Sequence, residues 1–163
     1  MTDAAWEQVP LENYEDFWEP FDARFHFRRT QQRAIDEPSP SVTFDLAPIF
    51  ASVPAQFAAA QQAVNAQALL AMTRAFGAAE RLIVLDWQHP SWWFRPHQQA
   101  VKGDQRWPVE VFPDGDYYAF LTQDLNSGTF GHPWDQTLCV FGALMRDLVP
   151  MLGAWLPVKR GQR

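Results

Sequence analysis

The longest amphipathic pattern along the chain covers residues 55–76. Its apolar positions recur every three or four residues, which places them on one stripe of a helix: Phe57, Val64, Ala68, Met72 and Phe76. Gly77 follows the last of them, where a glycine commonly ends a helix. The pattern predicts a helix of about six turns. Aromatic residues at helical spacing predict a shorter helix over 11–22, in which Pro20 is either a break or a residue of the last turn.

Four stretches in the first two thirds of the chain have the pattern of β-strands. Residues 24–28 and 41–45 alternate polar and apolar side chains, and the proline-containing loop between them predicts a hairpin with a long loop. Residues 82–85 are apolar on both faces, as in a central strand. Residues 91–95 lie between two prolines, which favours a short strand at an edge or bulge.

The remaining third predicts one hairpin and one helix. Residues 107–112 and 117–122 flank an Asp-Gly turn, a strong local hairpin pattern. Asp135 is suited to cap a final helix whose apolar stripe runs through Leu138 to Leu148. Two stretches are expected to be loops: 97–106 and 123–134.

Together these elements predict an α+β fold. We expect an antiparallel sheet of about five strands with two main helices packed on one face, in a single two-layer domain. The length of 163 residues favours one domain over 1–163. The segments 1–10 and 157–163 are expected to be frayed tails.

Composition and charge narrow the classes of partner. The chain is 47% hydrophobic, so it is expected to fold, and its net charge of −6 argues against nucleic acid, whose phosphates need a basic face. No apolar run approaches the ~20 residues of a membrane span, and no signal peptide is visible, so we expect a cytoplasmic protein without a membrane partner. The single cysteine, Cys139, excludes an internal disulfide and is expected to be buried in the last helix.

The densest chemistry lies in residues 86–96, directly after the apolar run 82–85. This segment supplies six candidate binding residues: Asp86, Trp87, His89, Trp92, Trp93 and Arg95. Indole rings offer contact area, and the charged groups can orient a polar ligand or a partner's side chain. The segment therefore predicts a binding surface.

The same segment also has a purely structural interpretation. The rings can be core or seal a strand edge, with His89 in a turn before a proline. Strand alternation puts Trp92 and Phe94 on one face and Trp93 and Arg95 on the other, so at least one indole is expected to point away from the main core. Both interpretations stay open at this point.

A second His-Pro pair supplies His132 and Trp134, with Asp124 upstream. Two histidines with acidic groups can bind Zn²⁺ or act as an acid–base pair. Neither histidine has the spacing of a ligand motif, so we expect no metal and no cofactor. Asp114, Asp116 and Asp124 around the predicted hairpin can mark a site for a metal or a cationic partner, but such residues are more often solvated turn residues, and we favour that interpretation.

Recognised catalytic signatures are absent from the sequence. It contains no glycine-rich phosphate loop, no nucleophile elbow and no zinc-protease motif. We therefore favour a protein that is not an enzyme.

Four runs carry a resemblance to a known family: 39–45, 85–90, 112–118 and 128–135. They resemble an uncharacterised bacterial family of the domain-of-unknown-function series (member twenty-seven sixteen). The similarity extends from about Trp18 to Trp155. The resemblance implies a single bacterial cytoplasmic domain, and it implies no activity or catalytic residue.

Three functional hypotheses follow. The first is a binding protein, antitoxin-like or immunity-like, whose acidic and aromatic surface covers a basic protein partner. The second is a small enzyme or small-molecule-binding domain in which His89 and His132 face each other across a cleft and hold a small polar ligand. The third is a homodimer whose interface is the aromatic patch.

Overall fold

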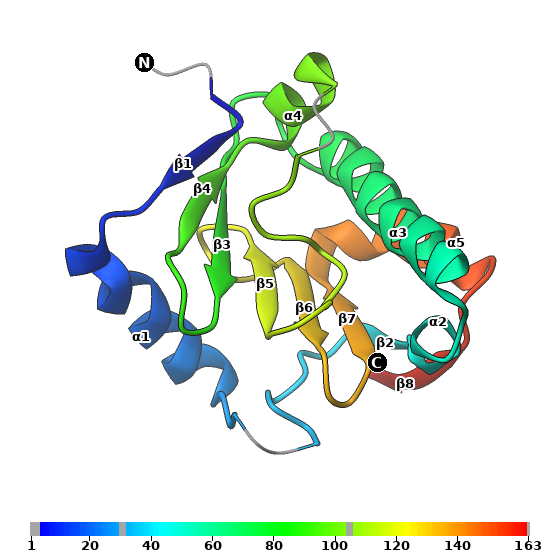
Figure 1. Cartoon of the computed structure of the whole chain (residues 1–163). Helices are drawn as coiled ribbons and strands as arrows, with labels where there is room; N and C mark the ends of the chain where they lie inside the picture. Colours follow the sequence, from blue (N-terminus) through cyan, green and yellow to red (C-terminus); the bar gives the residue numbers. More distant parts are fainter. Residues whose placement is uncertain (1–3, 30–31, 104–105, 163) are drawn as a thin grey trace.

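One sheet crosses the whole molecule. The computed structural model describes residues 4–29, 32–103 and 106–162. Within them, eight strands follow the order β1-β4-β3-β5-β6-β7-β2-β8, and every neighbouring pair is antiparallel (Figure 1). The strands are Trp6–Gln8 (β1), Ser41–Asp45 (β2), Leu82–Asp86 (β3), Trp92–Phe94 (β4), Tyr118–Leu121 (β5), Gly128–His132 (β6), Thr137–Phe141 (β7) and Val158–Gln162 (β8).

Helices lie on both faces of this sheet, with α3 and α5 on one side and α1 on the other (Figure 1). The α-helices are Tyr14–Phe25 (α1), Ala47–Phe50 (α2), Pro54–Ala75 (α3), Pro96–Lys102 (α4) and Met145–Gly153 (α5). Short 3₁₀ turns precede α1 and α5. The α+β class with an antiparallel sheet is confirmed, but the sheet is larger than about five strands and the two-layer arrangement is wrong.

Strand alternation explains why both faces need a cover. Val84 and Phe120 point toward the helix pair α3 and α5, where Met72 and Leu148 are fully buried. Their neighbours along the same strands, such as Leu85, point to the opposite face. Because side chains of a strand alternate, an apolar run such as β3 exposes one row of side chains unless a second layer covers it.

The second layer is α1. Its rings Trp18, Phe21 and Phe25 are buried against strands of the sheet, and Phe21 lies 6.1 Å from the Phe130 ring of β6. Pro20 lies inside α1 and does not break it. Burial of three large rings outweighs the cost of a proline in a helix interior, about 3 kcal/mol.

The predicted strand over 24–28 and its hairpin are wrong. Phe25 ends α1, and His26 has a left-handed conformation (φ 51°) whose backbone N–H donates to the Asp22 carbonyl at 2.8 Å. The alternation of Phe25 and Phe27 reflects a helix end followed by a turn. The predicted strand over 41–45 is confirmed as β2, which pairs with β7 and β8 instead.

Several predictions in the last third also change. The expected loop 97–106 contains α4, the expected loop 123–134 contains β6, and the expected strand 107–112 is irregular. Asn65 of α3 takes the place of a strand partner there, because its Oδ1 accepts the backbone N–H groups of Val111 (2.9 Å) and Phe112 (3.2 Å).

The final helix begins later than predicted. Residues 137–141 form β7, which is buried on both faces, so its apolar spacing satisfies a central strand as well as a helix. Asp135 caps no helix, and only α5 remains of the predicted helix. Cys139 is buried as expected, but in a strand, and burial raises the pKa of its thiol to about 12.

Both predicted tails belong to the sheet. Residues 6–8 form β1 beside β4, and residues 158–162 form β8 beside β2, so they are its two edge strands. Residues 1–3 and 163 lie outside the described residues.

The helix over 55–76 is confirmed as α3 and the strand over 82–85 as β3. No helix of the described ranges is long and apolar enough to cross a membrane.

Candidate functional site

Three neighbouring strands, β3, β5 and β6, bring the two His-Pro segments to the same end of the sheet. Asp86 at the end of β3 pairs with Tyr118 of β5, and Tyr118 pairs with Gly131 of β6, next to His132. Pro113 packs so closely on Gly131 that a Cβ there would lie 2.8 Å from the proline ring. This contact holds the chain that leads into β5 against the sheet.

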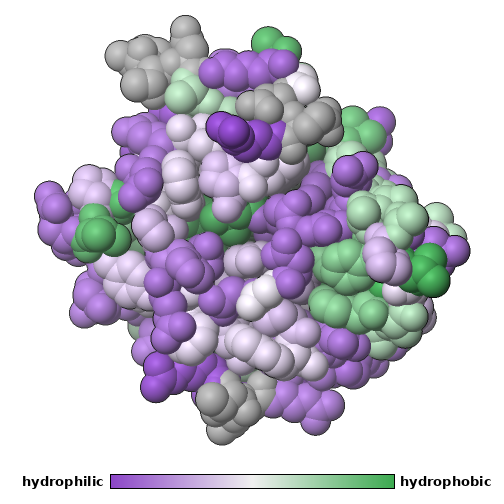
Figure 2. Space-filling view, in the orientation of Figure 1, coloured by the Kyte–Doolittle hydropathy of each residue, from purple (hydrophilic) through white to green (hydrophobic). Residues whose placement is uncertain are grey.

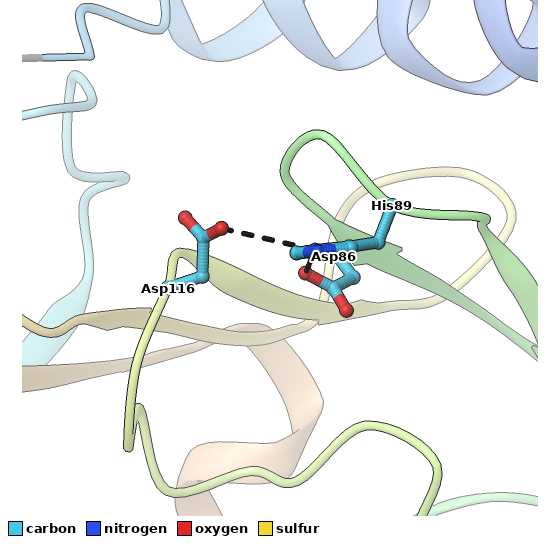
Figure 3. A group of neighbouring side chains, drawn as sticks. All are labelled: Asp86, His89 and Asp116. Atoms are coloured by element: carbon cyan, nitrogen blue, oxygen red, sulfur yellow. Dashed lines mark hydrogen bonds and ion pairs between the residues drawn. The ribbon is translucent and has the colours of Figure 1, made fainter.

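A carboxylate–histidine group lies at this end of the sheet and consists of Asp86, His89 and Asp116 (Figure 3). Asp86 is the last residue of β3, His89 lies in the turn that follows, and Asp116 directly precedes Tyr117. His89 Nδ1 is 2.9 Å from Asp86 Oδ1 and 3.8 Å from Asp116 Oδ2. The turn between Asp86 and His89 is closed by the His89 backbone N–H, which donates to the Asp86 carbonyl at 3.0 Å. Gln88 within the turn has a positive φ of 67°.

Charge and burial are unequal within this group. The side chains of Asp86 and Asp116 are 15% and 13% exposed, whereas that of His89 is 59% exposed. Burial raises the pKa of Asp86, although the hydrogen bond and charge of His89 lower it. Burial also raises the pKa of Asp116. The hydrogen bond to Asp86 raises the pKa of His89.

Tyr117 links the two His-Pro segments. Its buried ring lies 5.8 Å from the Trp87 ring of the first segment, and 4.9 Å from His132 and 5.0 Å from Trp134 of the second. His132 is buried, and its Nδ1 accepts the backbone N–H of Asp135 at 3.1 Å. Trp134 is 62% exposed, so this aromatic row ends on the surface.

A cleft of about 500 Å³ opens between α1 and Trp87. Four aromatic side chains, three acidic side chains and two arginines line it: Tyr14, Trp18, Phe27, Trp87, Glu15, Glu19, Asp22, Arg28 and Arg29. Arg29 lies over the Trp87 ring at 5.5 Å, and Arg28 pairs with Asp36 at 2.8 Å. Trp87 in the wall of the cleft directly follows Asp86 in the chain, so the cleft lies beside the carboxylate–histidine group. Burial raises the pKa of Tyr14, and a hydrogen bond to the Gln88 backbone lowers it.

The second half of the candidate segment 86–96 does not join the carboxylate–histidine group. Its candidate residues Trp92, Trp93 and Arg95 have other partners. Trp92 packs on Trp6 and the α3 side of the sheet with Phe94, whereas Trp93 packs on α1 through Phe17 (5.1 Å) and lies under the Arg81 guanidinium (3.6 Å). The predicted division of this segment between two faces is therefore confirmed. The Arg95 guanidinium lies 3.9 Å from Glu7 of β1.

Asp124 lies at the opposite end of β5. It accepts hydrogen bonds from the Thr122 hydroxyl (2.7 Å) and the Asn126 backbone N–H (3.0 Å), which lower the pKa of its carboxyl group. The carboxylate closes the turn between β5 and β6. This explains its presence without a ligand.

Sequence reasoning missed the residues that connect the site. Asp116 was interpreted as a solvated turn residue, and neither Tyr14 nor Tyr117 was a candidate. Their role depends on the pairing of β3 with β5, which joins segments about 30 residues apart. The only local signal was the run of acidic and aromatic residues after Gly115.

Comparison with known proteins yields relatives without an assigned activity. A family model described as "Protein of unknown function (DUF2716)" matches residues 9–145. The "Uncharacterized protein YxiI" of Bacillus subtilis (strain 168) is 42% identical over 74 residues, which cover 45% of this chain and 46% of the relative. The match thus spans about half the length of that protein. No solved structure matches the chain significantly.

Proposed function

The chain belongs to the family of unknown function DUF2716, and on the geometry of its site we propose that it is a binding protein for a basic protein partner. The aromatic–acidic surface that would hold this partner comprises Tyr14, Trp18, Trp87, Tyr117 and Trp134 with the carboxylates of α1. The exposed Trp134 at the end of a buried aromatic row is the observation that carries the proposal.

An exposed indole on a rigid support is a favourable contact residue. Trp134 is 62% exposed, and its ring contacts that of Tyr117, which is only 2% exposed. Tyr117 in turn contacts Trp87. Rigid aromatic side chains bury a large area at a small entropic cost, which is why Trp and Tyr are enriched among residues that dominate binding energies. The row is therefore suited to anchor a partner.

The charge of the cleft favours a basic partner. Glu15, Glu19 and Asp22 of α1 outnumber the two arginines that also line it, and one of these, Arg28, is already paired with Asp36. The chain as a whole carries a net charge of −6. Figure 2 shows a mostly hydrophilic surface in this view, with apolar side chains gathered on the side of α2 and α3. A negative surface of this kind attracts and orients a positively charged protein. An antitoxin-like or immunity-like role, in which the chain covers a basic active surface, fits this arrangement.

A cationic side chain is the expected occupant of the cleft. Arg29 of the chain itself lies over the Trp87 ring, so this wall accepts a guanidinium. The remaining aromatic wall, Tyr14 stacked on Trp18 at 5.9 Å, offers a second flat face beside the carboxylates. A lysine or arginine of the partner would extend along these rings toward Glu15 and Glu19.

Affinity purification with defined variants tests this proposal. The tagged chain and its Trp134→Ala and Glu15→Gln/Glu19→Gln variants are exposed to soluble lysate of the expressing cells at about 0.1 M and 0.5 M salt, and bound proteins are quantified. We expect a basic protein to bind the wild type at low salt and each variant at least ten-fold less. Its binding to the wild type should weaken at high salt, because salt screens the attraction between exposed charges.

Trp155→Ala is the matched control. Trp155 is 39% exposed and its Nε1 donates to Gln67 at 3.0 Å, at the end of α5, away from α1. Its substitution is expected to leave recovery of the partner unchanged. The proposal is contradicted if no basic protein is recovered at either salt concentration, or if Trp134→Ala and Trp155→Ala behave alike.

A second candidate is an acid–base enzyme centred on His89. The observation in its favour is the hydrogen bond of 2.9 Å between the exposed His89 ring and the largely buried Asp86, an arrangement that orients a catalytic imidazole. His132 is buried and its Nδ1 holds the turn, so proton transfer would depend on His89. This candidate predicts that any turnover by the purified chain falls at least 100-fold in His89→Gln and persists in Trp134→Ala.

A further inference from the structure

We infer that Asp86, His89 and Asp116 form a binding site for one divalent metal ion of the Zn²⁺ or Mn²⁺ type. This inference does not depend on the proposed protein partner. It rests on the donor set, the spacing of the donor atoms and the local balance of charge.

The donor atoms have the spacing that one metal ion requires. Neighbouring ligands on a metal with bonds of about 2.0–2.2 Å lie about 2.9–3.6 Å apart in tetrahedral or octahedral geometry. His89 Nδ1 lies 2.9 Å from Asp86 and 3.8 Å from Asp116, and one ligand atom of each residue lies within 4.8 Å of the others. Rotation of the Asp116 carboxylate toward the other two groups would shorten both of its separations, from His89 Nδ1 (3.8 Å) and from Asp86 (within 4.8 Å).

The charge balance distinguishes this group from other carboxylates of the chain. Within the described residues, the ion pairs of Asp86 and Asp116 are with His89 alone. Asp135, whose side chain is 2% exposed, instead has Lys159 at 2.9 Å and Arg160 at 3.2 Å, and these cations lower the pKa of its carboxyl group despite burial. Asp86 and Asp116 thus form a desolvated pair of carboxylates without a permanent cation, and a bound metal would supply it.

The surroundings of the group support an open site. Its two carboxylates come from the end of β3 and from the segment entering β5, and the exposed His89 ring contacts both of them (Figure 3). One nitrogen and two oxygen ligands suit Zn²⁺, Mn²⁺ or Fe²⁺ better than Ca²⁺, which takes six or more oxygens. Three protein ligands leave at least one position for water or for a group from the neighbouring cleft.

Calorimetric titration of the whole chain with ZnCl₂, after treatment with EDTA and removal of any histidine tag, tests the site. We expect one Zn²⁺ per chain, with a dissociation constant of about 10 μM or tighter. His89→Gln and Asp116→Asn are each expected to weaken binding at least ten-fold because each removes a ligand. Asparagine at 116 keeps the oxygen that accepts the Tyr117 backbone N–H, so the fold is retained.

His26→Gln is the matched control. His26 is also exposed and bonded to a carboxylate, Asp36 at 2.7 Å, but this carboxylate is already paired with Arg28 at 2.8 Å, and no second carboxylate forms an ion pair with His26 in the described structure. It is expected to bind Zn²⁺ as the wild type does. Co²⁺ substitution supplies a spectroscopic measurement, in which visible d–d bands are expected for the wild type and lost in His89→Gln. Absence of Zn²⁺ binding up to about 1 mM, or equal affinity of wild type and His89→Gln, would overturn the inference.

Discussion

At the scale of single residues, His89 is the group of the site that contacts both carboxylates, Asp86 and Asp116. It is exposed, so its substitution leaves the core intact, yet both of its acidic neighbours are largely buried. The imidazole is the cation nearest to these carboxylates in the described structure, and it can lose its charge near neutral pH. The state of His89 therefore sets the charge of this end of the sheet.

The titration of His89 is a direct prediction. In metal-free buffer, NMR is expected to place its pKa above the ordinary value of 6.5, because Asp86 accepts a hydrogen bond from the protonated ring. Asp86→Asn should return the pKa toward the ordinary value. Asp36→Asn, which removes the carboxylate partner of His26, should leave His89 unchanged. A titration of His89 that is the same in Asp86→Asn would contradict the proposed pairing.

The sign of the linked stability follows from this direction. A histidine whose pKa is raised on folding stabilises the fold fully below its unfolded pKa, and this contribution is lost as the pH rises through the folded value. The contribution is small because the ring is exposed and screened by solvent. An effect on this surface as the pH rises past 6.5, the ordinary pKa of histidine, is therefore expected in binding before it is seen in unfolding.

At the scale of elements, α1 decides whether a site exists. It packs Phe21 and Phe25 on the sheet, and this packing presents Tyr14, Glu15 and Glu19 along the cleft. A sheet covered only by α3 and α5 would leave that face bare, with no cleft beside Trp87. The site therefore depends on burial of the rings of α1.

Substitution of a buried ring of α1 tests this dependence. Phe21→Ala is expected to lower the free energy of unfolding by about 3–5 kcal/mol, since Phe21 is 1% exposed and its loss leaves a cavity. Leu11→Ala, at a residue just before α1 that is 69% exposed, should change it by about 0.5 kcal/mol or less. Urea unfolding measures both. Similar values for the two variants would show that α1 is not part of the core.

At the scale of the whole molecule, long-range pairing builds the site from local pieces. Residues 86–89, 113–117 and 132–134 lie far apart in the chain, and the order β3-β5-β6-β7 places their ends together. The edge strands β1 and β8 come from the two ends of the chain. The termini thus complete the sheet, although their short polar sequences resemble frayed tails.

Local sequence patterns determined several features of this protein. The spacing of apolar residues determined α3, and the apolar run 82–85 determined β3. Alternation was sufficient to divide Trp92 and Trp93 between two faces of the sheet. These features depend on neighbours within a few residues, and so the chain itself records them.

Only the tertiary structure decided the composition of the site. Within residues 86–96 it joined Asp86, Trp87 and His89 to Tyr117 and Asp116. It packed Trp92 against the core and paired Arg95 with Glu7 of the edge strand β1. It also showed that residues 137–141 are a central strand. The sequence alone could not decide this, because an apolar segment buried on both faces fits the spacing of a helix as well as that of a strand. The physical reason is the same in both cases: strand pairing acts between residues that are close in space and distant in sequence, and no local pattern encodes the partner.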